Sequence, residues 1–456
     1  MSPILEKPQI ETSMISTAPK TMTSDPPPTT KERPPLSFSP TDRFFRTLVH
    51  TTLARVSGGS ITIDEGNDSI TFGGGTGELS TTIEVHHRRF YRRLVLGGNL
   101  GAADSLIAGD WTCDDLTALV RIFVRTEYAG RDLNTGKLSL FRTFASRLTH
   151  WLRRNTVVKS RRNIQQHYDL GNDFYALWLD DTMTYSSGIF ESPQTTMRDA
   201  SIAKIDRICQ QLNLQPNDHL LEIGTGWGAL ALHAAREYGC RVTTTTISDE
   251  QHAEASRRIT AAGLSHRITL LKKDYRHLTG VYDKIASVEM IEAVGHEYYP
   301  QFFESCARLL KEDGAMVLQG IVIADEFYES HIRSTDFISQ YIFPGGSLPS
   351  ISTLVSTAAG SGGMRTLELL DIAPHYAETL RRWRTEFYRH LDQIRALGFD
   401  DQFIRMWEYY LCYCEAAFEE RRVNVVQIHF AKRGCKSDRL GGFECGPAGP
   451  LISLNA

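Results

Sequence analysis

One short stretch decides the fold of this chain: residues 221–228, which read LEIGTGWG. An apolar run of strand type leads into it and a helical pattern follows it, so its glycines stand at a strand-to-helix turn. Gly224, Gly226 and Gly228 let the backbone adopt left-handed angles at this turn and pass close to a ligand. The stretch therefore predicts a binding site at the end of a strand.

The spacing of the glycines separates two kinds of nucleotide site. A dinucleotide-binding turn has the pattern GxGxxG and holds a pyrophosphate at the N-terminus of the next helix. Here the spacing is GxGxG, and it follows an acidic residue, Glu222. This pattern is typical of class I methyltransferases, whose cofactor has no phosphate, and it favours S-adenosylmethionine, with Glu222 and the three glycines as expected cofactor contacts. The alternative is a tight turn between strand and helix that binds nothing.

Strand and helix patterns alternate on both sides of this turn. They occupy residues 220–223, 230–237, 241–247, 250–262, 268–272, 283–288, 299–310 and 316–322. Such alternation predicts an α/β fold with a doubly wound, Rossmann-like parallel sheet. After residue 323 the alternation stops; helical patterns follow at 378–397 and 403–422, and then a last strand at 425–430. We interpret residues 324–423 as a helical, lipid-binding insertion that covers the substrate.

The whole chain divides into four parts. Residues 1–40 contain nine of the 17 prolines and little to bury, so we expect a disordered leader. A small α+β domain is predicted over 41–150, with a helix at 44–55, strands within 60–72 and 81–85, and a helical pattern that includes Trp111. The methyltransferase domain takes 151–434, and 435–456 form a flexible tail.

Composition excludes several classes of protein. The net charge of −4 gives no overall basic excess for nucleic acid, and the eight cysteines show no CxxC pair that would suggest zinc or a disulfide framework. We expect no metal and a reducing, cytoplasmic setting. No apolar run approaches the roughly 20 residues of a spanning helix.

Hydrogen-bonding residues follow the next two predicted strands. Thr246 and Gln251 are placed to meet ribose hydroxyls, and Tyr275 and Arg276 to meet the adenine. Asp249 lies between the first two; it either contacts the ribose or caps the following helix.

Several longer motifs resemble one family. They are HYDLGNDF at 167–174, MTYSS at 183–187, the glycine turn, EMIEAVGHE at 289–297, YIFPGG at 341–346, HYAETL at 375–380 and the segment 409–418. In this order they are similar to cyclopropane fatty acid synthases and to the related mycolic acid and tuberculostearic acid methyltransferases, over residues 44–433.

The resemblance implies roles for individual residues. Those around S-adenosylmethionine are Tyr185, Ser186, Gly224, Gly226, Thr246, Gln251, Tyr275 and Arg276, while Glu292, Tyr376 and Cys414 line the reaction chamber. In many members a bicarbonate ion is the base, held by a cysteine, the glutamate, a histidine and the tyrosine. Here Ser187 replaces the cysteine and Gln319 replaces the histidine. The sequence therefore does not decide whether this chain binds bicarbonate.

The chemistry of an isolated double bond assigns roles to the chamber residues. The bond is a weak nucleophile, and after methyl transfer a carbocation must be tolerated, which favours the aromatic faces of Tyr185 and Tyr376. A base must then remove a proton. Glu292 is the expected base or bicarbonate anchor, with a purely structural helix-start role as its alternative. Cys414 is expected to pack and not to act as a nucleophile, since an alkene needs none.

Together these features predict an enzyme that forms a cyclopropane on an unsaturated phospholipid acyl chain. The first alternative is a methylene- or methyl-branched product, because Ser187 departs from the cyclopropanating pattern. Others are a soluble small molecule or a sphingolipid as substrate, and a degenerate lipid-binding protein. Peripheral contact with an anionic membrane is expected through the basic stretches 86–93, 153–162 and 381–384. The sequence does not decide between a monomer and a homodimer.

Overall fold

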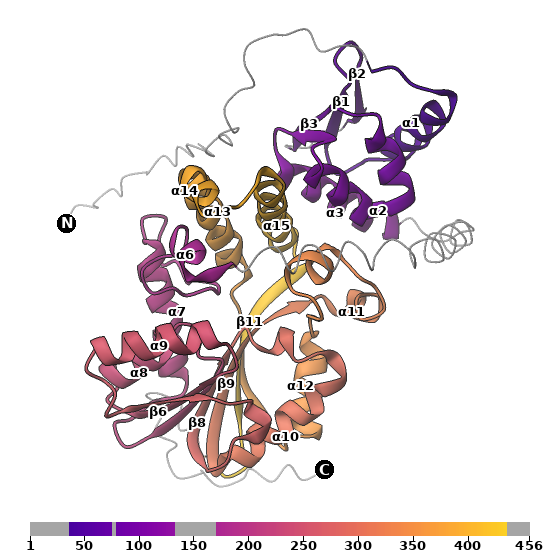
Figure 1. The fold of residues 1–456 in the computed structure, drawn as a ribbon. Helices are drawn as coiled ribbons and strands as arrows, with labels where there is room; N and C mark the ends of the chain where they lie inside the picture. The colour runs from indigo at the N-terminus through magenta and orange to yellow at the C-terminus, as the bar shows by residue number, and fades with distance from the viewer. Residues whose placement is uncertain (1–35, 75–78, 133–169, 436–456) are drawn as a thin grey trace, which may run out of the picture.

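The computed structural model describes residues 36–74, 79–132 and 170–435. Most of the predicted leader and tail, and the whole basic stretch 153–162, lie outside these residues. The described chain forms a small N-terminal α+β domain, a layer of helices, and a large α/β domain (Figure 1).

The N-terminal domain packs three helices on a four-stranded sheet. Helix α1 begins with a reciprocal cap, in which Ser39 and Asp42 each bond the other's backbone N–H. The sheet has the order β2-β1-β3-β4. Trp111 was expected in a helix but starts strand β4, where it pairs with Val85. The elements are α1 (Pro40–Leu53), β1 (Ser60–Asp64), β2 (Ser69–Gly73), β3 (Ser80–Val85), α2 (Arg89–Ile107), β4 (Trp111–Cys113) and α3 (Leu116–Asp132).

The large domain is built on a seven-stranded sheet in the order β10-β11-β9-β8-β5-β6-β7. Strands β5 to β9 are parallel, as predicted, whereas β11 runs antiparallel between β9 and β10. Strand β10 was not expected, because it lies within the insertion and reads as a mixed, half-exposed run. The strands are β5 (His219–Ile223), β6 (Arg241–Thr246), β7 (Ile268–Lys272), β8 (Tyr282–Val288), β9 (Leu310–Ile323), β10 (Arg365–Asp371) and β11 (Val423–Ala431).

Helices cover both faces of this sheet (Figure 1). Neighbouring residues of a strand point to opposite faces, so Leu220 packs into one apolar cluster and Leu221 into the other. The first cluster includes residues of α7 (Met197–Gln211), α8 (Ala229–Glu237) and α9 (Asp249–Ala261), and the second includes α10 (Tyr299–Leu309) and α12 (Ile351–Gly360). The two clusters fix the sheet between two helical layers, as the alternating pattern predicts.

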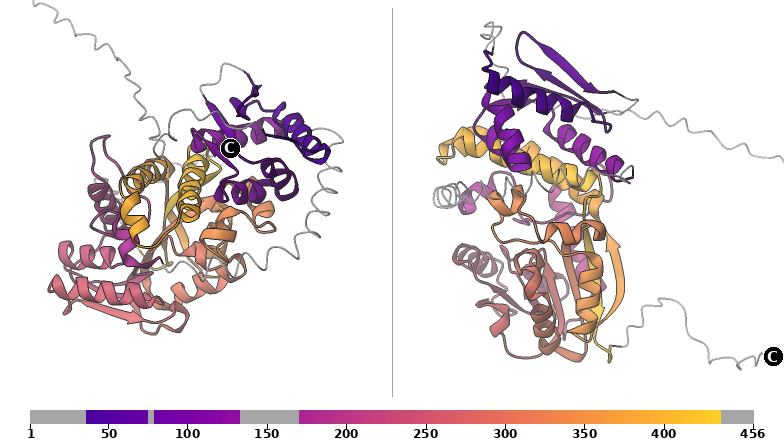
Figure 2. Two further views of the ribbon diagram at one scale, coloured as in Figure 1. Left: turned by 45° about the horizontal axis from the view of Figure 1, so that its top comes forward. Right: turned by 90° about the vertical axis from the view of Figure 1, so that its right-hand side faces the viewer.

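A third group of helices lies between the two domains, and Figure 2 shows it beneath the N-terminal domain. It contains α13 (Ala373–Arg389), α14 (Leu391–Ala396) and α15 (Asp401–Glu419); α6 (Gly171–Ala176) and α11 (Asp325–His331) lie nearby. The helix expected at 378–397 starts earlier, with Pro374 in its first turn, and breaks at His390. Just beyond the end of α15, Glu420 binds Arg121 (2.7 Å) and Arg125 (2.9 Å) of α3, which links this layer to the N-terminal domain.

Candidate active site

The predicted cofactor turn lies at the carboxyl end of β5, where the chain order of the strands reverses between β5 and β8. Ligands of doubly wound sheets bind at this position. Gly224, Gly226 and Gly228 have φ values of 101°, 52° and 91°, which side-chain-bearing residues rarely adopt. The N–H groups of Gly224 and Thr225 both donate to the Thr245 carbonyl (3.1 Å), so strand pairing continues into the turn.

The turn lies next to the loop that follows β8. A methyl group built on Gly224 would stand 3.5 Å from Cβ of Met290, which is flanked by Glu289 and lies two residues before Glu292. The glycine turn and the EMIE segment are therefore neighbours, although 64 residues separate paired backbone positions of β5 and β8. The glycine turn therefore lies next to the segment that carries two glutamates.

Glu222, predicted as a cofactor contact, points to the neighbouring strand. Its carboxylate accepts a hydrogen bond from Thr244 (2.6 Å), and Thr244 also bonds Thr225 in the turn (2.6 Å). Burial raises the pKa of Glu222 to about 8. Within the described residues, Glu222 is thus linked to the glycine turn by hydrogen bonds through Thr244 and Thr225.

The predicted ribose and adenine contacts end the next two strands. Thr246 Oγ1 donates to Gln251 Oε1 (3.0 Å), which joins the end of β6 to the first turn of α9. The cap of α9 is Ser248, which accepts from the Gln251 N–H, and Asp249 instead pairs with Lys272. Asp249 is therefore not the capping residue.

The predicted adenine contacts follow β7. Arg276 is paired with Asp274 (2.6 Å), and the ring of Tyr275 packs edge-on against Phe302 (centroids 5.5 Å apart). Both residues belong to a short 3-10 turn, Tyr275–His277, which Asp274 caps by accepting from the Arg276 N–H. The turn follows the carboxyl end of β7, on the same side of the sheet as the glycine turn.

Sequence reasoning missed Lys204, which is 2 % exposed. Its ammonium group donates to Ser186 Oγ (2.7 Å) and lies in the field of Glu289, Glu222 and Asp180. Burial lowers the pKa of Lys204 to about 8, and these three acidic side chains oppose that shift. A signal was present: Lys204 occupies an apolar position of α7, four residues before the fully buried Ile208.

Three predicted chamber residues converge on one carboxylate, that of Glu289. Its Oε1 accepts from the Ser187 N–H (3.1 Å) and from Gln319 Nε2 (2.8 Å), and its Oε2 accepts from the Tyr376 hydroxyl (2.7 Å). Gln319 is held by Gln427, whose amide donates to it (3.0 Å). The sequence places Glu289 in a motif but gives no sign that it is the centre of the cluster.

Glu292 lies beside Glu289 and has a different environment. One carboxylate oxygen accepts from the Ile321 N–H; the other is buried and has no partner within the described part of the chain. Burial, together with the charge of Glu289, raises the pKa of Glu292 to about 8. A carboxyl group of this kind is protonated at neutral pH.

The raised pKa of Glu292 makes stability depend on pH. Between pH 4.5 and about 8 the unfolded chain loses this proton and the folded chain keeps it. The contribution of Glu292 to the free energy of unfolding is therefore highest below pH 4.5, where both states are protonated, and it falls as the pH rises through this window. We expect Glu292→Gln to gain stability over the parent by about 1–3 kcal/mol between pH 5 and 8. Urea unfolding at several pH values measures this gain. Glu312→Gln, which changes an exposed carboxylate, serves as the control. A gain that does not vary with pH would contradict the expectation.

Aromatic side chains pack around Tyr376, one of the donors to Glu289. The hydroxyls of Tyr185 and Tyr410 are hydrogen-bonded (2.7 Å), and the ring of Tyr376 stacks on Phe418 (centroids 4.5 Å apart, planes at 26°). The ring of Tyr185 also packs against Tyr175, Trp178, Trp383 and Phe343. Such faces attract a cation without forming a bond to it.

Cys414 lies on α15 within this aromatic group, in the electrostatic field of Tyr185, Tyr376 and Tyr410. Burial raises the pKa of the Cys414 thiol, so the sulfur is not a thiolate. This agrees with a packing role.

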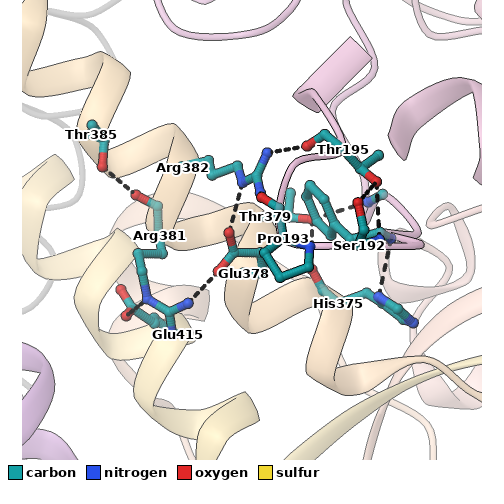
Figure 3. Close-up of polar contacts among 12 residues, drawn as sticks. Ser192, Pro193, Thr195, His375, Glu378, Thr379, Arg381, Arg382, Thr385 and Glu415 are labelled. Atoms are coloured by element: carbon teal, nitrogen blue, oxygen red, sulfur yellow. Dashed lines mark hydrogen bonds and ion pairs between the residues drawn. The ribbon is translucent and has the colours of Figure 1, made fainter. Parts of the chain in front are cut away.

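Helix α13 carries Tyr376 and is tied to the loop that carries Ser187 (Figure 3). Thr379 Oγ1 accepts from the Gly188 N–H (3.1 Å), and His375 Nδ1 accepts from the Phe190 N–H (3.1 Å). Arg382 donates to the backbone carbonyls of Thr195 and Pro193 farther along the loop. These contacts fix the relative positions of two of the three donors to Glu289.

Two of the basic stretches expected to face a membrane, 86–93 and 381–384, lie in the described part of the chain, and their arginines are largely paired within the protein. Figure 3 shows Arg381 and Arg382 with Glu378, and Arg384 pairs with Glu415 (2.9 Å). In the stretch 86–93, Arg89 (2.7 Å) and Arg93 (2.9 Å) both bind the buried Asp110. The paired arginines bind acidic side chains of the chain itself.

Among the residues that the structure describes, no helix is both long and apolar enough to cross a bilayer. The same residues include no group of three or more His, Cys, Asp or Glu side chains that could hold a metal ion.

The sheet order with its antiparallel β11, and the glycine turn at the switch point, define a class I S-adenosylmethionine-dependent methyltransferase. The model of one family, described as mycolic acid cyclopropane synthetase, matches residues 155–428, and the chain belongs to this family. Both the fold class and the family expected from the sequence are confirmed.

Three relatives show the extent of the similarity. Tuberculostearic acid methyltransferase UfaA1 of Mycobacterium tuberculosis is 36% identical over 75% of this chain and 81% of its own length. Cyclopropane-fatty-acyl-phospholipid synthase of Escherichia coli is 32% identical over 78% and 89%. The crystal structure of mycolic acid cyclopropane synthase CmaA1 complexed with SAH and CTAB is 33% identical over 60% and 98%, with a TM-score of 0.55.

Proposed function

We propose that this methyltransferase acts on the double bond of an unsaturated fatty acyl chain of a phospholipid and forms a cyclopropane fatty acid. The observation that carries the proposal is the carboxylate of Glu289, held by three donors among aromatic side chains and next to the cofactor turn. A methyltransferase for an oxygen or nitrogen nucleophile needs no aromatic surround for a carbocation. The names of the relatives support a lipid substrate.

The residues of the site match the demands of this reaction. S-adenosylmethionine supplies an electrophilic methyl group, and the double bond must be aligned with it where water is excluded. The rings of Tyr185 and Tyr376 stabilise the positive charge that develops on the acyl chain. A carboxylate at the same place removes the proton that must leave.

A branched product is the second candidate. UfaA1, named for tuberculostearic acid, is 36% identical, and Ser187 stands where the cyclopropanating pattern has cysteine. The same cation gives a methylene branch when a hydride shifts first and the proton is lost afterwards. A saturated methyl branch then requires a separate reductant, such as a reduced nicotinamide. Both products need the same methyl transfer.

The cellular setting is also a proposal. Phospholipid acyl chains lie within a bilayer, so we place the protein at the cytoplasmic surface of a membrane as a peripheral protein. Separation of membranes from cytosol in low salt and in high salt tests this placement.

The first experiment measures the product. We expect cells rich in monounsaturated phospholipid, expressing the protein and fed methyl-labelled methionine, to yield fatty acids heavier by one labelled CH2 and without the double bond. Mass spectrometry of the methyl esters measures this, with cells lacking the protein as the control. A labelled branch supports the second candidate. If labelled lipid is absent while the purified protein binds S-adenosylmethionine, the chain is a degenerate lipid-binding homologue.

A further inference from the structure

We propose that the carboxylate of Glu289 is the base of this reaction and takes the place of the bicarbonate ion that the family resemblance implies. This inference rests on the proposed function and deepens it. It assigns the proton-removing step to a side chain that belongs to the protein itself.

The donors that a bicarbonate ion would need are already bound to Glu289. The family pattern gives the anion to the positions of Ser187, Gln319 and Tyr376, and in this chain each of them donates to Glu289 at 2.7–3.1 Å. A second anion at this place would also face the charge of Glu289 at close range. The residues therefore do not fit a separate bicarbonate ion, and they do fit a carboxylate.

The backbone of Glu289 is a second, independent observation. Its φ is 48°, a left-handed value that favours glycine, and it is one of four non-glycine residues with positive φ among those described. The Glu289 N–H bonds the Gln319 carbonyl (2.8 Å), which holds it in this conformation. A glutamate at a position suited to glycine is retained against a conformational cost, and such residues gather at functional sites.

Glu289 and Glu292 differ in the donors around them, and this difference affects which of the two is ionised. Burial raises the pKa of Glu289, but Tyr376, Lys204, Gln319 and the Ser187 N–H oppose this shift, because all favour the ionised form. Glu292 has one N–H partner and one oxygen without a partner in the described chain. The three donors to Glu289 thus favour its ionised form, while the oxygen of Glu292 without a partner favours the protonated form there.

The proposed step balances without a further reactant. The alkene electron pair forms a bond to the methyl carbon while the carbon–sulfur bond breaks. S-adenosylhomocysteine leaves with the electron pair of that carbon–sulfur bond. Glu289 then takes a proton from the new methyl group, and the released C–H pair closes the three-membered ring. The proton passes to solvent, which restores the carboxylate. Alkene and S-adenosylmethionine thus give cyclopropane, S-adenosylhomocysteine and one proton.

The variant Glu289→Gly tests the proposal, because it removes the carboxylate and leaves a residue suited to φ 48°. Asn213→Gly is the matched control: Asn213 is exposed, has φ 49° and lies outside the site. Activity is measured with methyl-labelled S-adenosylmethionine and dioleoyl phosphatidylglycerol vesicles in carbon dioxide-free buffer, with and without added bicarbonate. Binding of 13C-bicarbonate to each protein is followed by NMR, which does not depend on turnover.

We expect the parent and Asn213→Gly to be fully active without bicarbonate and to bind none. Glu289→Gly is expected to lose about 100-fold in rate, to bind 13C-bicarbonate between the freed donors, and to regain activity when it is added. A parent enzyme that binds bicarbonate or needs it for activity would overturn the inference, and so would a Glu289→Gly variant of undiminished rate. A parent enzyme with no labelled lipid product overturns the proposed function instead; bicarbonate binding then still decides whether Glu289 fills the anion position.

Discussion

Replacement of Gly224 by valine is expected to weaken the binding of S-adenosylmethionine about 1,000-fold, or about 4 kcal/mol. The backbone at Gly224 has φ 101°, and a β-branched residue does not adopt this angle without moving the turn. The added side chain would also point toward Met290, 3.5 Å from the new Cβ, where the cofactor turn meets the loop of Glu289. Isothermal titration of the purified protein with S-adenosylmethionine measures the loss.

Gly263→Val is the matched control for this variant. Gly263 also has a positive φ, 68°, and open space around it, but it follows the end of α9, away from the glycine turn. It adds the same side chain and similar backbone strain, so it should change stability and leave the affinity for S-adenosylmethionine within about twofold. If Gly224→Val bound the cofactor as well as this control does, the cofactor would not lie at the turn.

Replacement of Tyr376 by phenylalanine is expected to lower kcat by about 100-fold to 1,000-fold, the effect of losing one donor to a catalytic anion. The change removes the hydroxyl that donates to Glu289 (2.7 Å) and keeps the ring that stacks on Phe418. Affinity for S-adenosylmethionine should stay the same, because the hydroxyl bonds the carboxylate. Initial rates with labelled cofactor and lipid vesicles give kcat.

Tyr91→Phe separates this effect from a general loss of stability. The Tyr91 hydroxyl is likewise bonded to a carboxylate, that of Glu65, but in the N-terminal domain. Both variants should lose a similar amount of stability, about 1–3 kcal/mol, since each leaves a buried carboxylate with one donor fewer. Only Tyr376→Phe should lose kcat. Equal losses of rate in the two variants would assign Tyr376 a structural role alone.

Local sequence patterns were sufficient for the part of the fold that local physics controls. The GxGxG turn between strand and helix predicts the cofactor edge of the sheet, and alternating apolar patterns predict β5 to β9 and the helices between them. Strand β10 escaped because its half-exposed residues pair only with β11, which lies more than 50 residues farther along. The break at His390 escaped because the helical pattern continues across it.

The predicted catalytic set shows the same division. The motifs place Ser187, Gln319, Tyr376 and Glu292 in one chamber, and the structure brings them together. The sequence by itself thus determined the class of enzyme and its cofactor, and it predicted a group of residues that lie together in the structure. Which carboxylate those residues hold was decided by the tertiary structure alone, because the bonds of Glu289 to Ser187 and Tyr376 span 102 and 87 residues. The position of Lys204 was also decided by the tertiary structure. Its ammonium group meets Ser186 and the acidic side chains near it only when α7 packs against the sheet, and its neighbours in sequence do not predict this burial.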